Sequence, residues 1–187
     1  MQHQFYSLQE VSEIVNGKLV GEADLKVSDL LIDSRHLMDP SQALFFALKS
    51  NRNDGHRYID ELYEKGVRAF VVSHLPENTY LDAVFVVVPD TLKALQMLAA
   101  HHRRQFDIPV IGITGSNGKT IVKEWLYQML SPEYNIVRSP KSYNSQVGVP
   151  LSVWQMNPTN TLGIFEAGIS EPEEMMNLQD IIRPTIG

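Results

Sequence analysis

The stretch that decides the fold is residues 111–120, which read I-G-I-T-G-S-N-G-K-T. An apolar strand predicted at Val110–Thr114 runs into a glycine-rich turn, and a helix is predicted to open at Lys119. Gly115 and Gly118 can adopt positive φ, which lets backbone N–H groups converge on an anion. The start of the helix adds unpaired N–H groups and the positive end of its dipole. The stretch therefore predicts a parallel α/β fold that binds a phosphate group.

The side chains of this turn favour a nucleoside triphosphate with a metal ion. Lys119 can reach the β- and γ-phosphates of ATP, and the hydroxyl of Thr120 can enter a Mg²⁺ shell. Ser116 and Asn117 complete the loop between the glycines. The strict P-loop pattern has a glycine where this chain has Ile113, so the match is to a variant. The G-x-G-x-x-G spacing of a dinucleotide site is absent. The alternative is an ordinary glycine turn followed by Lys-Thr.

Glu166 is the candidate acidic partner of the loop. It lies near the end of an apolar strand predicted at Leu162–Ala167. Ligands of open parallel sheets bind beyond the carboxyl ends of the strands, so this carboxylate is expected beside the phosphates. As a hard oxygen ligand it can hold Mg²⁺ directly or through water. The alternative is a solvated carboxylate at a strand end.

Alternating strands and helices extend on both sides of the loop. Further strands are predicted at 27–32, 44–48, 69–72, 84–88 and 135–138. Further helices are predicted at 8–15, around 59–63, at 91–106, from about 150, and at 173–182. The short apolar runs suit strands that are buried on both faces. Pro89 interrupts the pattern, so we predict two α/β parts, residues 1–89 and 90–187.

The composition excludes several classes of protein. Apolar residues make up 43% of the 187 residues and charged residues 20%, which is typical of a globular chain. The net charge of −6 argues against a nucleic-acid binder. The absence of cysteine excludes disulfides and thiolate chemistry. We find no signal peptide and no apolar run near the roughly 20 residues that span a bilayer, so we expect a cytoplasmic protein without membrane insertion.

Three further features have structural interpretations. His101–Arg104 is interpreted as a solvated helix end, where cations favour the dipole. Trp125 and Met129, four residues apart, are interpreted as core residues of the helix after the loop. Residues 181–187 end one helix and begin a strand. Because domains seldom stop at the start of a buried strand, we expect a fragment of a longer protein.

Several motifs taken together resemble the Mur ligases, cytoplasmic enzymes that build the peptide of bacterial cell-wall precursors. The motifs are residues 113–120, Asn144 with Gly148 and Pro150, residues 165–168, D-S-R at 33–35, residues 44–48, and N-D-G-H at 53–56. The resemblance covers essentially the whole chain. It implies a small N-terminal α/β domain for a UDP-sugar, followed by the first part of a P-loop-type parallel α/β ATPase domain.

The resemblance also implies a role for each matching residue in the ATPase part. Residues 115–118 would cradle the ATP phosphates, and Lys119 would stabilise the transferring γ-phosphoryl group. Thr120 and Glu166 would serve Mg²⁺. Asn144 would lie near the nucleotide or the bridging phosphates.

In the N-terminal part, Ser34 and Arg35 would contact the uridine diphosphate, and Asn53, Asp54 and Gly55 would shape the same pocket. An arginine suits a diphosphate because its planar donors bind in a bidentate manner. The residues alone favour a different interpretation of Ser34-Arg35, as a turn with a surface salt bridge.

Within the family, Lys123-Glu124 and residues 147–151 resemble the ligases that add D-alanyl-D-alanine to UDP-N-acetylmuramoyl-tripeptide. Such ligases use ATP to form an acyl phosphate, which the incoming amine displaces. Residues 166–172 are more similar to the ligase half of ligase–alanine racemase fusions, and they imply no role for Ile169 or Ser170. Family members need further central residues and a third domain, so we expect residues 1–187 alone not to ligate.

Three alternatives stay open from the sequence. The first is a related ligase, either one that adds the third peptide residue or a folylpolyglutamate synthase, and the UDP-sugar motifs argue against the folate enzyme. The second is a P-loop NTPase or small-molecule kinase without amide chemistry, which leaves the N-terminal part unexplained. The third is a non-catalytic module that retained a nucleotide fold.

Overall fold

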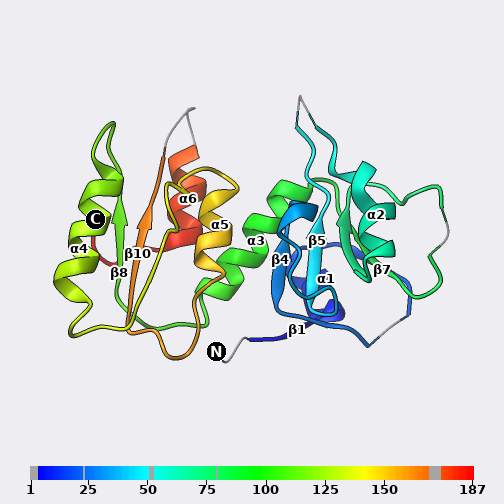
Figure 1. The fold of residues 1–187 in the computed structure, drawn as a ribbon, viewed down its shortest axis with the longest axis horizontal. Helices are drawn as coiled ribbons and strands as arrows, with labels where there is room; N and C mark the ends of the chain where they lie inside the picture. The colour runs from blue at the N-terminus through cyan, green and yellow to red at the C-terminus, as the bar shows by residue number, and fades with distance from the viewer. Residues whose placement is uncertain (1–3, 23, 51–52, 79, 169–173) are drawn as a thin grey trace. The chain divides into compact units, whose positions relative to one another are not determined.

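The computed structural model describes residues 4–22, 24–50, 53–78, 80–168 and 174–187. Its contacts divide the chain into two compact units, one from His3 to Leu98 and one made mainly of Ala99 to Gly187 (Figure 1). The division falls inside helix α3 (Thr91–Arg103), whereas the sequence predicted it near Pro89, just before this helix. The assignment of a UDP-sugar to the first part and ATP to the second stays a prediction.

A five-stranded sheet in the order β2-β7-β6-β5-β4 forms the N-terminal unit. The parallel strands are β4 (Asp29–Leu31), β5 (Ala43–Phe46), β6 (Ala69–Val72) and β7 (Val84–Val87), and β2 (Lys18–Val20) joins β7 antiparallel. A separate antiparallel pair consists of β1 (Tyr6–Ser7) and β3 (Lys26–Val27). The helical elements are α1 (Leu8–Ile14), η1 (Ser34–His36), η2 (Gly55–Tyr58) and α2 (Ile59–Glu64), where η marks a short 3₁₀ helix.

The core of this unit follows from its apolar strands. Every residue of β5 and β6 is buried, as expected for strands covered on both faces. Phe70 packs between Phe45 and Phe85, with ring centroids 6.3 and 5.3 Å away. The first helix begins at a capping box, in which Ser7 Oγ accepts from the N–H of Glu10 at 3.2 Å and the Ser7 N–H donates to the Glu10 carboxylate at 2.7 Å.

The strand structure predicted at 27–32 is observed as two short strands, β3 and β4, because the chain changes partner at Ser28. Val27 pairs with Tyr6 in the two-stranded sheet. The N–H groups of Ser28 and Asp29 both donate to the carbonyl of Gln42, at 3.0 and 3.1 Å. The next residues then continue as β4 in the larger sheet.

A parallel three-stranded sheet in the order β8-β10-β9 forms the second unit. Its strands are β8 (Val110–Ile113), β10 (Leu162–Glu166) and β9 (Ile136–Arg138), and its helices are α4 (Lys119–Leu130), α5 (Gly148–Val153) and α6 (Glu174–Ile182). Helix α4 lies on one side of β8 and β10, and α5 and α6 lie on the other (Figure 1). The α/β fold class predicted from the sequence is therefore confirmed.

The central strand β10 is buried along its whole length because helices cover both of its faces. Leu162 and Ile164 pack with Leu126 and Leu130 of α4. Phe165 belongs to the cluster on the opposite face, which includes residues of α5 and α6. The predicted strand 69–72 has the observed bounds, and α4 begins at Lys119 as predicted. Most of the other predicted elements differ from the observed ones by a few residues at their ends. Glu173, predicted to start the last helix, lies outside the described residues.

The prediction that Trp125 and Met129 are core residues is wrong. Their exposed fractions are 63% and 74%. Helix α4 instead turns Leu126 and Leu130 toward the sheet, together with Lys123, which is fully buried. An apolar pair four residues apart marks a helix face, but it does not decide which face meets the sheet.

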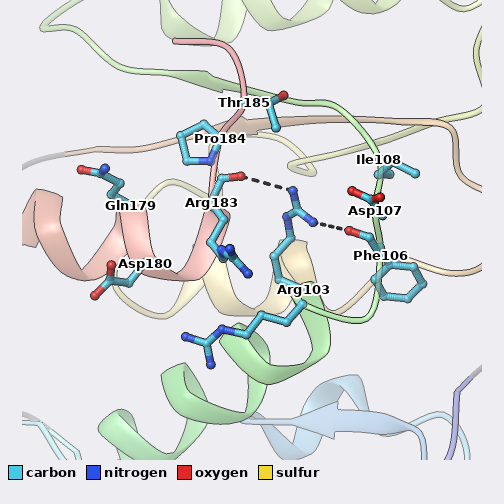
Figure 2. A pocket seen from close by; sticks show the side chains of 10 residues that line it. Arg103, Phe106, Asp107, Ile108, Gln179, Asp180, Arg183, Pro184 and Thr185 are labelled. Carbon is cyan, nitrogen blue, oxygen red and sulfur yellow. Dashed lines mark hydrogen bonds between the residues drawn. The ribbon is translucent and has the colours of Figure 1, made fainter.

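The prediction of a solvated helix end at 101–104 is wrong for its two middle residues. His102 is 2% exposed, and its Nε2 lies 3.0 Å from the carbonyl of Met156. Arg103 is 5% exposed and donates to the carbonyls of Ile182 at 2.8 Å, Phe106 at 2.7 Å and Arg183 at 3.2 Å. Figure 2 shows the latter two bonds beside a pocket of about 550 Å³. The end of α3 is thus an anchor for the segments around it.

In the part of the chain that the structure describes, none of the helices is long and apolar enough to cross a membrane.

Candidate functional site

The loop between β8 and α4 keeps its backbone donors open. Gly115 and Gly118 have φ values of 135° and 81°, which residues with a side chain rarely adopt. Among the described residues, no acceptor is found for the N–H groups of Ser116, Asn117 and Gly118. A Cβ built on Gly118 would meet nothing within 4 Å. The loop is therefore a nest of converging backbone donors, and Gly118 is needed for its conformation rather than for space.

Helix α4 directs its N-terminus into this loop. Gly118 is the N-cap residue and supplies no side-chain cap, so the first N–H groups of the helix remain available to an anion. The Nζ of Lys119 donates to the carbonyl of Gly115 at 2.6 Å. The ammonium of Lys119 is therefore held against the loop itself, where a bound phosphate would meet it.

Glu166 lies directly beside the loop. In the parallel pairing of β10 and β8 it is the partner of Ile113, the last residue before the turn, and the N–H of Ala167 donates to the carbonyl of Ile113 at 2.8 Å. Thr120 Oγ1 donates to Glu166 Oε2 at 3.1 Å. Glu166 is 0% exposed, so the alternative of a solvated carboxylate at a strand end is wrong.

The oxygen atoms of Thr120 and Glu166 fit a magnesium ion. Glu166 Oε1 is buried and accepts no hydrogen bond within the described residues, although Lys123 Nζ lies 2.9 Å away as an ion-pair partner. Mg²⁺ is commonly bound by one or two protein oxygens together with phosphates and water, not by a complete protein cage. Accordingly, the described residues contain no cluster of three His, Cys, Asp or Glu side chains. The metal role of both residues stays a prediction.

Asn144 lies at the same end of β10. Its carbonyl accepts from the N–H of Gly168 at 2.8 Å, and a Cβ on Gly168 would come within 3.0 Å of Asn144 Cγ. The Oγ of neighbouring Ser142 is 3.4 Å from Thr120 Oγ1. The segment that contains Ser142 and Asn144 therefore approaches the phosphate loop, while the predicted nucleotide contact of Asn144 stays a prediction.

Sequence reasoning missed two residues that support Glu166. Ser139 Oγ accepts from the backbone N–H of Glu166 at 3.1 Å. Lys123, used from the sequence only as a family marker, places its fully buried ammonium against the Glu166 carboxylate. The signal for Lys123 was its position on the same face of α4 as Leu126 and Leu130, where a charge needs a partner.

In the N-terminal unit, Ser34 and Arg35 lie in η1 directly after Asp33. Arg35 Nε donates to the two Asp33 carboxylate oxygens at 2.9 and 3.1 Å, and the Arg35 side chain is 83% exposed. These hydrogen bonds hold the pKa of Asp33 well below its usual range. The geometry is that of the turn with a surface salt bridge that the residues alone favoured, and a diphosphate contact stays a prediction.

The two predicted UDP-binding motifs meet around the start of α2. Tyr58 OH donates to Asn53 Oδ1 at 3.3 Å, and Tyr58 also interacts electrostatically with Arg35. Lys65 and, more weakly, Ser34 lower the pKa of Glu61, so Ser34 lies beside that carboxylate. Residues 33–35 and 53–55 are far apart in sequence, so this juxtaposition is a property of the fold. Tyr58, which sequence reasoning missed, connects them.

Asp54 and Gly55 hold their loop against the sheet. Asp54 Oδ1 lies 2.6 Å from His56 Nδ1, and His56 Nε2 accepts from the N–H of Ser73 at 3.0 Å. A Cβ on Gly55 would come within 2.8 Å of the backbone of Ala47. Both residues thus have a structural task here, and their predicted part in a UDP pocket is untested.

Comparison with known proteins gives two family matches and a consistent set of relatives. The model of the Mur ligase family, catalytic domain, matches residues 26–103, and that of the Mur ligase middle domain matches residues 113–187. The chain is similar to UDP-N-acetylmuramoyl-tripeptide--D-alanyl-D-alanine ligases of Synechocystis, with 35% identity over 88% of this chain and 36% of the relative, and of Bacillus subtilis, with 30% over 95% and 39%. It therefore spans about two fifths of the length of these relatives.

Solved structures agree with the sequence relatives. MurF from Acinetobacter baumannii superposes with a TM-score of 0.90 at 26% identity, over 98% of this chain and 40% of that one. MurF ligase from Thermotoga maritima, solved in complex with ADP, gives a TM-score of 0.73 at 28% identity, over 83% and 35%. The two family models together match more than half of the residues, in the order in which the two units follow each other. The chain therefore belongs to the Mur ligase family.

Proposed function

We propose that this chain is part of an ATP-dependent ligase that adds D-alanyl-D-alanine to UDP-N-acetylmuramoyl-tripeptide in the cytoplasm. The observation that carries the proposal is the set of backbone donors at residues 116–118 beside the partly buried Thr120–Glu166 contact of 3.1 Å. The choice of this member of the family is supported by relatives that carry this name at 29–36% identity.

In this proposal the phosphate loop binds and orients ATP. The N–H groups of residues 116–118 and of the first turn of α4 hold the phosphates. Lys119 exchanges its 2.6 Å bond to the Gly115 carbonyl for the γ-phosphoryl group, where its charge offsets the charge that develops in the transition state. Thr120 and Glu166 would hold Mg²⁺, which supplies further neutralisation of the phosphate oxygens.

The chemistry that the loop serves is amide formation through an acyl phosphate. An oxygen of the substrate carboxylate forms a bond to the γ-phosphorus while the bond from that phosphorus to the bridging oxygen of ADP breaks. The amine nitrogen then bonds to the acyl carbon, phosphate leaves with its oxygen, and the nitrogen loses a proton. The task of the residues at the loop is to position the first of these steps.

The N-terminal unit would hold the UDP part of the second substrate. Arg35 is exposed and already makes bidentate contacts to a carboxylate, the geometry that also suits a diphosphate. Asn53 is hydrogen-bonded to Tyr58, with which Arg35 interacts electrostatically, and Ser34 lies beside Glu61. Binding there requires that the diphosphate replace Asp33 as the partner of Arg35.

Calorimetry with residues 1–187 tests the proposal. Mg·ATP and UDP-N-acetylmuramoyl-tripeptide are each expected to bind, and UDP is expected to compete only with the latter. Binding of ATP alone would instead indicate a P-loop NTPase without amide chemistry, and an unchanged nucleotide affinity after Lys119→Ala would indicate a non-catalytic module.

Ligation itself needs a longer chain. We expect no phosphate release on addition of both substrates and D-alanyl-D-alanine to residues 1–187. A chimera that carries residues 1–187 in place of the matching part of the Bacillus subtilis relative is expected to ligate. Ligation by residues 1–187 alone, or a chimera that folds and binds both substrates but never ligates, would contradict the proposal.

A further inference from the structure

Lys123 is a fully buried cation that ties three segments together. Its Nζ donates to the carbonyl of Ser139 at 2.8 Å and to the carbonyl of Lys141, and it lies 2.9 Å from Glu166 Oε1. The more exposed carboxylate of Glu124 is 3.4 Å away. A buried ammonium is retained only where charges and acceptors surround it, so these contacts fix its position.

The segment that Lys123 binds contains a strained residue. Lys141 has φ of 50°, in the left-handed region that residues with a side chain adopt only at a conformational cost. It lies in a turn in which the N–H of Tyr143 donates to the carbonyl of Pro140 at 3.1 Å. The carbonyl of this strained residue is one of the two that Lys123 binds. The ammonium therefore offsets a local conformational cost.

The same segment reaches the phosphate loop. Ser142 Oγ is 3.4 Å from Thr120 Oγ1, and the Asn144 carbonyl accepts from the Gly168 N–H at 2.8 Å. Beyond Lys123, one end of the segment is held by Ser139, which accepts from the N–H of Glu166 at 3.1 Å. Loss of the two carbonyl contacts would free the turn between these points.

We propose that Lys123 is a positioning residue, whose buried ammonium holds residues 139–144 beside the phosphate loop through the Ser139 and Lys141 carbonyls. The proposal rests on the proposed function, because its consequence is that residues 139–144 are already in position at the nucleotide site before ATP binds. Lys119 and Lys123, four residues apart on α4, then have different roles. Lys119 binds the phosphates, and Lys123 positions residues 139–144.

The rival explanation is that Lys123 merely neutralises Glu166. The two explanations differ in which second substitution rescues Lys123→Met. If Lys123 holds the strained turn, Lys141→Gly restores the turn, because glycine adopts positive φ without cost. If it only balances charge, Glu166→Gln restores the site, because it removes the unpaired buried carboxylate.

The test measures amide hydrogen exchange at Tyr143 and Gly168 without ligand, and the dissociation constant for Mg·ATP. Lys123→Met is expected to accelerate exchange at both amides and to weaken Mg·ATP binding, each about tenfold. Adding Lys141→Gly is expected to recover most of both effects. Adding Glu166→Gln is expected to raise the melting temperature while exchange stays fast. Glu124→Gln, which changes the other neighbour of the ammonium, is the matched control and is expected to leave exchange unchanged.

Unchanged exchange in Lys123→Met, or recovery by Glu166→Gln and not by Lys141→Gly, would overturn the proposal. If Lys123→Met does not fold, the Lys123→Met, Glu166→Gln variant with and without Lys141→Gly gives the same comparison on a background without an unpaired charge. The exchange measurement needs no nucleotide. If the unsubstituted chain does not bind Mg·ATP, the proposed function is contradicted. The hydrogen-exchange results still decide the role of Lys123 in that case.

Discussion

The phosphate loop and the region around Arg35 differ in whether their polar groups already have partners within the protein. At the loop, the N–H groups of residues 116–118 have no acceptor among the described residues, so an anion adds contacts without breaking any backbone bond. Around η1, Arg35 is bound to Asp33, and Asp54 is bound to His56. If a diphosphate binds there as proposed, it must displace one of these partners before it makes its own contacts. The proposal therefore makes the first site preorganised and the second a site of partner exchange.

The largest effect is expected from removing the ammonium of Lys119, which bonds to a backbone carbonyl of the phosphate loop. Lys119→Ala should weaken Mg·ATP binding up to about a hundredfold, the size expected for the loss of a hydrogen bond from a charged group to the phosphates. Because Lys119 bonds only to the exposed Gly115 carbonyl, the melting temperature should barely change. Calorimetry and thermal unfolding check both expectations. Lys65→Met, which removes an exposed lysine paired with Glu61, is the control.

A pair of glycine substitutions separates a conformational role from a packing role. Gly55→Ala should destabilise the N-terminal unit by about 2 kcal/mol, because the new Cβ would lie 2.8 Å from the Ala47 backbone. Gly118→Ala should cost about 1 kcal/mol through its φ of 81°, since the added carbon meets nothing within 4 Å.

Denaturant unfolding of both glycine variants gives the stability difference. Only Gly118→Ala should also weaken Mg·ATP binding, by distorting the donor nest. Equal stability costs at the two positions, or a nucleotide defect confined to Gly55→Ala, would remove the distinction between the regions.

Because Arg35 would exchange Asp33 for a diphosphate, its removal should have a smaller effect, which appears in substrate binding and not in stability. Arg35→Ala should leave the free energy of unfolding almost unchanged, because the salt bridge to Asp33 is exposed and screened by solvent. It should weaken binding of UDP-N-acetylmuramoyl-tripeptide about tenfold through loss of the bidentate donors. Arg57→Ala, in the neighbouring η2, is the control for a general change in surface charge. An unchanged affinity would show that Arg35 has no part in the UDP site.

The sequence was sufficient where the signal is local. The phosphate loop, the start of α4 and the position of Glu166 at a strand end all follow from consecutive residues, and the structure brings Thr120 and Glu166 within 3.1 Å. The capping box at Ser7 is equally local. Such features depend on backbone geometry over a few residues, which the residue types determine directly.

The sequence was insufficient to predict which residues are buried where tertiary packing decides between equivalent faces or partners. Helix α4 offers Trp125 with Met129, and also Leu126 with Leu130, at the same spacing, and only the sheet decides which pair is buried. His102 was interpreted as solvated because its burial depends on packing against Met156, distant in sequence. The buried ammonium of Lys123 likewise has its partners in two later segments. These outcomes are tertiary, so no local pattern specified them.

Lowering the pH should destabilise the second unit before the N-terminal unit. This is the smallest effect that we predict. Burial lowers the pKa of His102 to about 4 from its ordinary 6.5, against the bond to the Met156 carbonyl. A lowered folded-state pKa means that the unfolded chain binds the proton more readily, so the stability of the second unit should fall as the pH falls from 6.5 toward 4.

In the N-terminal unit, hydrogen bonds lower the pKa of Asp33 and Asp60 from 3.8, so their contribution should be lost only at still lower pH. Trp125 and Trp154 are the two tryptophans of the chain, and both lie in the second unit, so their fluorescence reports its unfolding. The fluorescence midpoint in urea should drop between pH 6.5 and 4.5, and His102→Gln should flatten that dependence because an amide does not titrate in this range. An equally steep dependence in His102→Gln would assign the acid sensitivity to another group.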